Sequence, residues 1–423
     1  MTYKTYEKYI NIDNHFFELM PLDWNIYKLK YITSSLESGK RKDFDDTTYA
    51  FSLGGEHINW EGTLNLTNKR YISEDFYNSM NKGKIQENDV LLVKDGATIG
   101  KTAFVDNLVQ KMAVNEHVFI VRHNNIVLPK LLYYLISSHI GFTQIKLTET
   151  GSAQGGISQD ILDKVDFIIP SNLTLQKQMV NFLDTKVTKI DATIAKNKEL
   201  IDLLEEKRVA LINQLVTKGL NPDVPMKDSG VDIIGNIPKN NKIVRLKFLC
   251  NIKTGDKDTV NRNPDGKYPF YVRSPIVERI DTYSFDGEAV LMARDGVGAG
   301  KVFHYATGKF DYHQRVYNFH NFKHVVPKFI YYYMSSLFSI EIEKGSAKST
   351  VDSVRLPMLE DFLICYPPIN EQKQVIAYLD NETLKIDSII SKVKENIKLL
   401  DEYKTSLIHH VVTGKIDVRG EEI

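Results

Sequence analysis

Residues 176–217, QKQMVNFLDTKVTKIDATIAKNKELIDLLEEKRVALINQLVT, form a long stretch without Gly or Pro, and residues 372–413, QKQVIAYLDNETLKIDSIISKVKENIKLLDEYKTSLIHHVVT, repeat it. The offset between matching positions is constant at 196 (372 minus 176), so neither copy carries an insertion. A helix of this length spans roughly 63 Å at about 1.5 Å per residue. We therefore predict two long helices of equal length.

Apolar side chains recur at alternating steps of three and four in both stretches, which is the heptad pattern of a coiled coil. The predicted pairing residues of the first stretch are Val180, Leu183, Val187, Ile190, Ile194, Ile201, Leu204 and Leu211. Those of the second stretch are Ile376, Leu379, Ile386, Ile390, Ile397, Leu400 and Leu407. Arg208 and Lys404 interrupt this seam at equivalent positions. Since one helix cannot bury so narrow a stripe alone, we predict an antiparallel coiled coil; the alternative is that each helix caps a separate domain.

The segments between the helices also repeat. PKLLYY at 129–134 returns as PKFIYY at 327–332, and KDG at 94–96 with GK at 100–101 returns as RDG at 294–296 with GK at 300–301. Both segments consist of short β-rich runs broken by Gly and Asn turns, with a helix expected at 129–138 in the first. Offsets near 200 exclude a short solenoid repeat. The fold class is therefore α/β: two mixed α/β domains joined and separated by two long helices, in a pseudo-two-fold duplication.

This duplication predicts six segments along the chain. They are a first α/β domain at 1–170 that includes a short N-terminal arm, a first long helix at 171–219, a linker at 220–235, a second α/β domain at 236–368, a second long helix at 369–416 and a C-terminal tail at 417–423. The mixed polar and aromatic arm at 1–20 could hold a helix. Insertions fall only in the globular parts, so the helices set the geometry while the domains can differ.

Composition excludes several classes of protein. The 423 residues are 42% hydrophobic and 26% charged, which is typical of two or three globular cores. No stretch approaches the roughly 18 apolar residues of a membrane span, so a cytoplasmic protein is expected. The net charge of +0 alone does not point to a polyanionic partner. Cys250 and Cys365 have no companion at metal-ligand spacing, and we expect both to be buried rather than disulfide-bonded or bound to zinc.

Motifs for catalysis are missing from the sequence. GATIGKT at 96–102 is one residue short of a phosphate-binding loop, and Val302 replaces Thr102 in the second copy. We therefore expect a Gly-rich turn between two strands, with Lys101 and Lys301 facing solvent or DNA. No methyl-donor motif and no hydrolytic zinc motif is complete. The chain reads as a binding protein without a catalytic, cofactor or metal site.

Basic and amide side chains beside aromatic residues are the remaining signal, because Arg and Gln can read guanine and adenine edges through two hydrogen bonds. The candidates for DNA contact are Lys69, Arg70, Tyr71, Lys101, His117, Arg273, Arg294, Lys301, Gln314 and Arg315. Each of these side chains, taken singly, more often belongs to a surface salt bridge or a strand edge than to a DNA contact.

Over essentially its full length the chain resembles the specificity subunit of Type I restriction-modification systems. The resemblance is carried by Gln176-Lys177-Gln178 with Phe182-Leu183-Asp184 and Ile190-Asp191, by their copies Gln372-Lys373-Gln374 with Tyr378-Leu379-Asp380 and Ile386-Asp387, by Pro170 and Pro367-Pro368, and by DSGV at 228–231 ahead of Ile237-Pro238. It implies a non-catalytic subunit whose two target recognition domains each read one half of a bipartite, asymmetric DNA target, while the helices set the spacer.

The resemblance also implies the partners. These are double-stranded DNA, two modification (methyltransferase) subunits and two restriction subunits, with S-adenosylmethionine, ATP and Mg bound by the partner subunits and no membrane involved. Glu116-His117 stands where the second domain has Gln314-Arg315, so base contacts should not be transferred between the domains. Two other classes remain open. Salt-independent failure to bind any duplex in the presence of the partner subunits would favour a structural coiled-coil adaptor without a DNA role. Activity of the isolated chain on DNA or nucleotide would favour an enzyme with an unrecognised site.

Overall fold

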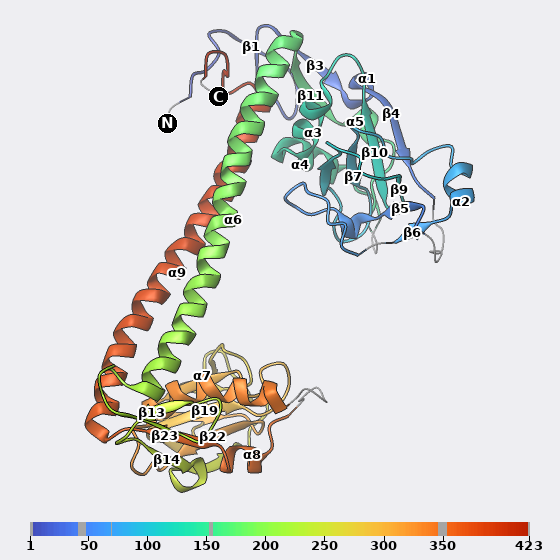
Figure 1. Cartoon of the computed structure of the whole chain (residues 1–423). Helices are drawn as coiled ribbons and strands as arrows, with labels where there is room; N and C mark the ends of the chain where they lie inside the picture. Colours follow the sequence, from blue (N-terminus) through green and yellow to red (C-terminus); the bar gives the residue numbers. More distant parts are fainter. Residues whose placement is uncertain (1–2, 41–47, 69, 152–154, 346–352, 422–423) are drawn as a thin grey trace. The chain divides into compact units, whose positions relative to one another are not determined.

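The computed structural model describes residues 3–40, 48–68, 70–151, 155–345 and 353–421. The chain divides into two compact units, Met1–Lys196 with Glu395–Ile423, and Asn197–Lys394. Both boundaries fall inside the long helices α6 (Leu173–Lys218) and α9 (Ile369–Val412), drawn in green and red in Figure 1. Each unit therefore combines one α/β domain with part of each long helix.

The first unit contains two sheets and two separate strand pairs. The antiparallel sheet has the order β4 (Thr33–Ser38), β10 (Val118–His123), β7 (Val90–Val93) and β8 (Thr102–Phe104). The mixed sheet has the order β6 (Tyr71–Ile72), β5 (Ala50–Leu53) and β9 (Met112–Val114), in which β5 and β9 are parallel. The pairs are β1 (Tyr9–Asn11) with β2 (Leu19–Pro21), and β3 (Trp24–Lys28) with β11 (Asp166–Pro170). Its short helices are α1 (Leu29–Ile32), α2 (Glu74–Ser79), α3 (Pro129–Ser137), α4 (His139–Leu147), α5 (Ile161–Lys164) and the 3-10 turn η1 (Gly55–His57).

The second unit repeats this topology with one additional strand, β18 (Phe285–Asp286), in its mixed sheet. Its antiparallel sheet has the order β15 (Asn251–Thr254), β22 (Val316–His320), β19 (Ala289–Ala293) and β20 (Phe303–Ala306). Its mixed sheet has the order β17 (Glu278–Ile280), β16 (Tyr268–Tyr271), β21 (Lys309–Tyr312) and β18 (Phe285–Asp286), with β16 and β21 parallel. The pairs are β12 (Met226–Asp228) with β13 (Asn236–Pro238), and β14 (Lys242–Arg245) with β23 (Leu363–Tyr366). Its helices are η2 (Leu246–Phe248), η3 (Thr259–Asn261), α7 (Pro327–Gly345) and α8 (Leu356–Glu360). The duplicated mixed α/β architecture predicted from the sequence is confirmed.

The strand β7 shows why the core forms where it does. All four of its side chains are buried, because successive residues of a strand point to opposite faces of the sheet and both faces are covered. Val90 and Leu92 belong to the cluster that includes the helices, while Leu91 and Val93 belong to a separate cluster against the mixed sheet. The equivalent strand β19 is divided between two clusters in the same way. The continuous apolar run is thus the signature of a strand covered on both faces.

The N-terminal and C-terminal segments of the chain contact each other in the first unit. The arm that could have held a helix instead forms β1 and β2, and Tyr9 Oη donates to Gly414 O at 2.9 Å. Asp417 N donates to Lys4 O at 2.8 Å, and Val418 is 4% exposed. The described C-terminal residues therefore complete the first unit, and Figure 1 shows the N-terminal and C-terminal segments close to each other there. In the second unit the equivalent hairpin is β12 with β13, which lies partly in the segment expected to be a linker.

The two long helices pack against each other in both units. In the first unit Lys404 Nζ lies 2.7 Å from Asp191 Oδ1, and in the second Arg208 pairs with Asp387. Residue numbers that rise along α6 meet numbers that fall along α9, so the predicted antiparallel coiled coil is confirmed. None of the fifteen residues predicted to line the seam is exposed. The two basic interruptions of the seam each meet an aspartate of the opposite helix.

A buried glutamine attaches each domain to its helix. Gln176 is 0% exposed; its Oε1 accepts from Leu128 N at 2.9 Å, and its Nε2 donates to Ile126 O and Pro170 O at 2.8 and 2.9 Å. Gln372 is also 0% exposed and makes the same three bonds in the second unit, to Val326 N, His324 O and Pro367 O at 2.8, 3.1 and 2.8 Å. The repeated Gln-Lys-Gln motif therefore places a side-chain amide between two loops of the domain and satisfies their buried backbone groups.

A tyrosine of each domain strengthens this attachment by bonding an aspartate that lies eight residues after the glutamine on the long helix (184 minus 176 and 380 minus 372). Tyr134 Oη donates to Asp184 Oδ1 at 2.6 Å, and Tyr332 Oη donates to Asp380 Oδ1 at 2.6 Å. The pKa of both tyrosines is raised, mainly by burial and secondly by the hydrogen bond to the aspartate, so each hydroxyl keeps its proton. These contacts fix the direction in which each domain leaves its own helix.

Replacement of this glutamine should destabilise one unit. Gln176→Ala leaves two carbonyls and one N–H buried without their partner, and we expect the free energy of unfolding to fall by roughly 2–5 kcal/mol. The melting temperature in a calorimetric scan measures this. Gln178→Ala is the matched control, because Gln178 is exposed on the same helix and the change in helix propensity is identical. Equal melting temperatures for the two variants would contradict the role assigned to Gln176.

Candidate nucleic-acid interface

Two equivalent turns follow the central strands β7 and β19. Gly100 N donates to Val93 O at 3.0 Å, and Gly300 N donates to Ala293 O at 3.0 Å. Gly96 and Gly296 have φ of 81° and 77°, a left-handed conformation that favours glycine. Each turn leads into another strand, β8 or β20, rather than into a helix. The expected Gly-rich turn between strands is confirmed, and the arrangement is not that of a phosphate-binding loop.

In the second unit the turn carries a cluster of arginines. Arg273 Nη1 lies 2.9 Å from Asp295 Oδ1, and Arg315 Nε lies 3.6 Å from Asp295 Oδ2. The Arg315 side chain is 53% exposed, whereas that of Asp295 is 21% exposed. The guanidinium of Arg294 lies over the ring of Tyr317, 5.8 Å from its centre. Two of the arginines predicted from the sequence, Arg273 and Arg315, are therefore brought together around one carboxylate.

In the first unit the same place is occupied by a histidine and a lysine. His117 Nδ1 lies 2.5 Å from Asp95 Oδ1, and Lys94 Nζ lies 3.3 Å from Asp95 Oδ2. His117 Nε2 also lies 3.3 Å from Glu116 Oε1. The His117 side chain is 51% exposed, close to the exposure of Arg315.

Backbone hydrogen bonds establish which residues correspond. Lys94 N donates to His117 O at 3.0 Å, and Arg294 N donates to Arg315 O at 2.9 Å. His117 and Arg315 thus occupy the same position, immediately before β10 and β22.

The counterpart of Arg273 follows from strand register. Leu53 pairs with Val114 as Tyr271 pairs with Tyr312, and two residues beyond them lie Gly55 in the first unit and Arg273 in the second. The first unit therefore has no side chain at the place where the second has an arginine.

Gln314 lies beside this cluster. Its Nε2 donates to Asp258 Oδ2 at 2.5 Å. His313, which precedes it, is 2% exposed, and burial lowers its pKa, with Asp258 acting in the opposite direction. The neutral ring accepts from Arg315 N through Nδ1 at 2.9 Å. His313 thereby shapes the backbone that presents Gln314 and Arg315.

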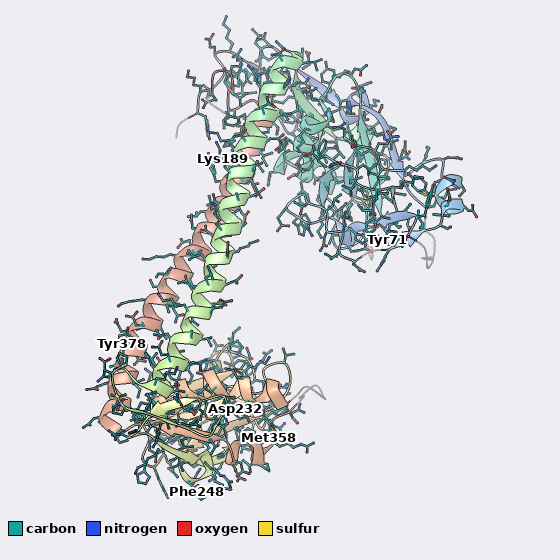
Figure 2. All side chains as sticks on the ribbon, viewed as in Figure 1. Tyr71, Lys189, Asp232, Phe248, Met358 and Tyr378 are labelled. Carbon is teal, nitrogen blue, oxygen red and sulfur yellow. The ribbon has the colours of Figure 1, made fainter. Side chains whose placement is uncertain are left out.

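The remaining candidates lie apart from these two clusters. Arg70 Nη1 lies 3.0 Å from Glu56 Oε1, and Tyr71, labelled in Figure 2, packs its ring against Phe51 at 6.1 Å. Lys101 Nζ lies 5.6 Å from the ring centre of Trp60, at the rim of a hollow of about 420 Å³ between the first domain and its helices. Lys301 is exposed at the end of its turn, and Lys69 lies outside the described residues.

Sequence reasoning did not select Asp95, Asp295 or Trp60. The repeated Lys/Arg-Asp-Gly triplet was visible, but the contacts of its aspartate with residues about 20 positions away were not. Trp60 is 60% exposed, which a sequence does not show.

Within the described residues, no three His, Cys, Asp or Glu side chains are grouped to hold a metal ion, and no described helix is long and apolar enough to cross a membrane. Cys250 and Cys365 are buried and free of disulfides, as expected, and burial raises the pKa of their thiols to about 12 and about 11.

The chain thus consists of two equivalent α/β domains on an antiparallel helix pair, with a cluster of charged side chains at the same turn of each domain. The family described as Type I restriction modification DNA specificity domain matches residues 21–205 and 238–399. These two ranges cover most of the chain. The chain therefore belongs to the Type I restriction-modification specificity subunits, which recognise DNA.

Individual relatives agree with this family. The chain is 21% identical over 424 residues to the putative type I restriction enzyme MjaX specificity subunit of Methanocaldococcus jannaschii, covering 95% of each. It is 26% identical over 182 residues to the type I restriction enzyme EcoDI specificity subunit of Escherichia coli, a match that spans 43% of this chain and 40% of that subunit.

Solved structures share the fold. A chain from a study of complex assembly and conformational transition of the type I R-M system superposes with a TM-score of 0.66 at 17% identity, covering 94% of this chain and 99% of that one. The HsdS subunit from Thermoanaerobacter tengcongensis gives a TM-score of 0.52 at 15% identity, covering 94% and 98%.

Proposed function

We propose that each α/β domain reads one half of a bipartite, asymmetric DNA target, and that the helix pair sets the number of unread base pairs between the halves. The observation that carries this proposal is the turn that is the same in both domains but presents different side chains. His117 stands beside Asp95 where Arg315 and Arg273 stand beside Asp295. Two domains with the same fold and different side chains at the equivalent turn are suited to recognise two different half-sites.

The partners follow from the same proposal. This chain would place two modification subunits on double-stranded DNA to methylate adenine, and two restriction subunits would join them for cleavage, all in the cytoplasm. Catalysis would lie wholly in those subunits, which would bind S-adenosylmethionine, ATP and Mg. The modification subunits would have to take each target adenine out of the base stack to reach it.

Methylation mapping tests the function directly. The chain is expressed with its modification subunit in cells that lack other adenine methylation, and modified bases are located by sequencing. We expect one motif with two specified halves and an unread spacer, and none when the chain is omitted. A correctly assembled complex that methylates no motif, or a single continuous one, would contradict the proposal.

A single arginine should affect one half-site. A bidentate contact to a base is worth about 1–3 kcal/mol, so Arg315→Ala should relax the second half-site by roughly 5- to 150-fold and leave the first unchanged. Competition binding with duplexes altered in one half at a time measures this. Arg245→Ala is the matched control, because Arg245 is 55% exposed on β14 of the same unit and pairs with Asp361. Equal losses at both half-sites would show that Arg315 does not read bases.

A further inference from the structure

Both proposed readers carry a carboxylate at their centre. Asp95 and Asp295 occupy the same position of the same turn, two residues after the end of β7 and of β19. Each lies in an isolated bridge with the segment that returns to the turn, Asp95 with Gly156 and Asp295 with Ser353. Their side chains are 30% and 21% exposed, so both carboxylates are partly buried in the domain surface.

A carboxylate on a surface that binds DNA weakens binding unless its charge serves another role, such as holding a basic side chain. DNA carries one negative charge per about 1.7 Å of helix axis, and an acidic group that faces phosphates weakens binding. Basic side chains contact both aspartates, although in the first unit Glu116 is a second carboxylate beside His117. Asp295 contacts Arg273 and Arg315, and Asp95 contacts His117 and Lys94.

Comparison of the two domains separates two roles. A group that is identical in both domains cannot distinguish two different half-sites, and the aspartate is identical. The side chains that it holds differ, since His117 corresponds to Arg315 and Gly55 corresponds to Arg273. The aspartate is therefore suited to hold a base-contacting side chain in place. The basic side chains that differ between the domains are suited to contact the bases.

The geometry around Asp295 fits this role. A guanidinium has five N–H donors, and Arg315 faces the carboxylate through Nε. That contact leaves its Nη edge to face the O6 and N7 acceptors of a guanine. A long side chain loses conformational freedom when it binds, and an arginine already held by an ion pair loses less.

We propose that Asp95 and Asp295 are positioning residues for base reading. Asp295 presets Arg315 and Arg273 toward one half-site, and Asp95 presets His117 toward the other. This inference rests on the proposed function. It adds that selectivity at each half-site depends on an acidic residue that contacts no base.

The test uses the full chain assembled with its modification subunit. Asp295→Asn keeps the size of the side chain and removes its charge, and Asp95→Asn is its matched control in the other unit. Binding is measured to the mapped target and to duplexes altered in one half. For Asp295→Asn we expect selectivity at the second half-site to fall by roughly 10-fold with selectivity at the first unchanged, and the converse for Asp95→Asn.

Two further variants separate positioning from a structural effect. Asp295→Glu retains the charge and should recover part of the selectivity. In an Arg315→Ala background, Asp295→Asn should remove less selectivity than in the wild-type chain, because one side chain that it positions is already absent.

Three results would overturn the proposal: unchanged selectivity in Asp295→Asn, equal losses at both half-sites, or tighter binding to every duplex with selectivity preserved. The last would mean that the aspartate merely repels phosphates. A wild-type complex without selectivity at either half-site would instead contradict the proposed function itself.

Discussion

Insertion of one heptad into each long helix should lengthen the spacer of the methylated motif by about three base pairs without changing either half-site. Seven residues add about 10.5 Å at 1.5 Å each, and base pairs are stacked about 3.4 Å apart. A copy of residues 188–194 placed after Ile194, together with a copy of residues 384–390 placed after Ile390, repeats the apolar seam. The original motif should then no longer be methylated, which makes this one of the largest effects expected of any change to the chain.

The helix contacts explain why both insertions are needed. The Lys404–Asp191 and Arg208–Asp387 ion pairs lie 17 residues apart on each helix, counted from 191 to 208 and from 387 to 404. Equal insertions keep both pairs in register, and a full heptad keeps the seam on the facing sides. A single insertion in α6 is the control, and it should break one of the two pairs and lower stability. An unchanged spacer in the doubly extended chain would show that the helices do not measure the distance.

The half-length chain, residues 1–219, should self-associate and direct methylation to a symmetric target made of two copies of the first half-site. Asp191 and Asp387 are equivalent, as are Arg208 and Lys404. In a dimer of half-chains, each Arg208 can therefore meet Asp191 of the second copy. The pseudo-two-fold of the full chain would become a true two-fold. Light scattering and methylation mapping with the modification subunit measure these outcomes.

Two features of the structure sharpen this experiment. Asn197 Nδ2 is buried and lacks a hydrogen-bond partner among the described residues. In a dimer of half-chains, Asn197 of both copies would lie in the helix seam. The full chain has Val393 at the equivalent position of the second helix. Asn197→Val should therefore strengthen the dimer. The half-chain also lacks Ile416 and Val418, which complete the core of the first unit. Joining Thr217 directly to Gly414 restores them in register. A folded but monomeric chain in both versions, with no palindromic methylation, would show that the halves are not interchangeable.

Local periodicity was sufficient to predict much of this fold. The heptad seam predicts paired helices because an apolar stripe of that width needs a partner, and the constant offset of 196 identifies that partner as the other copy. The repeated Gly-rich turns predict equivalent turns in both domains. None of these inferences needs more than the spacing of residue types along the chain.

The secondary structure of the arm at 1–20 could not be predicted from local sequence. Its composition allowed a helix, but the strands β1 and β2 form there because the C-terminal residues pack beside them, as in the bond from Tyr9 to Gly414. This contact joins residues 405 positions apart. A contact at such a separation leaves no periodic trace in either segment.

The sequence by itself determined the duplication, the two long helices and their pairing, and it supplied single basic and amide side chains as candidates for DNA contact. Only the tertiary structure decided what those side chains contact. It places Asp295 between Arg273 and Arg315, sets Asp95 against His117, and buries Gln176 and Gln372 between loops of their domains. The physical reason is that helix pairing follows from apolar spacing within one segment, whereas a hydrogen bond or ion pair depends on the relative position of two strands or loops, which only the folded chain fixes.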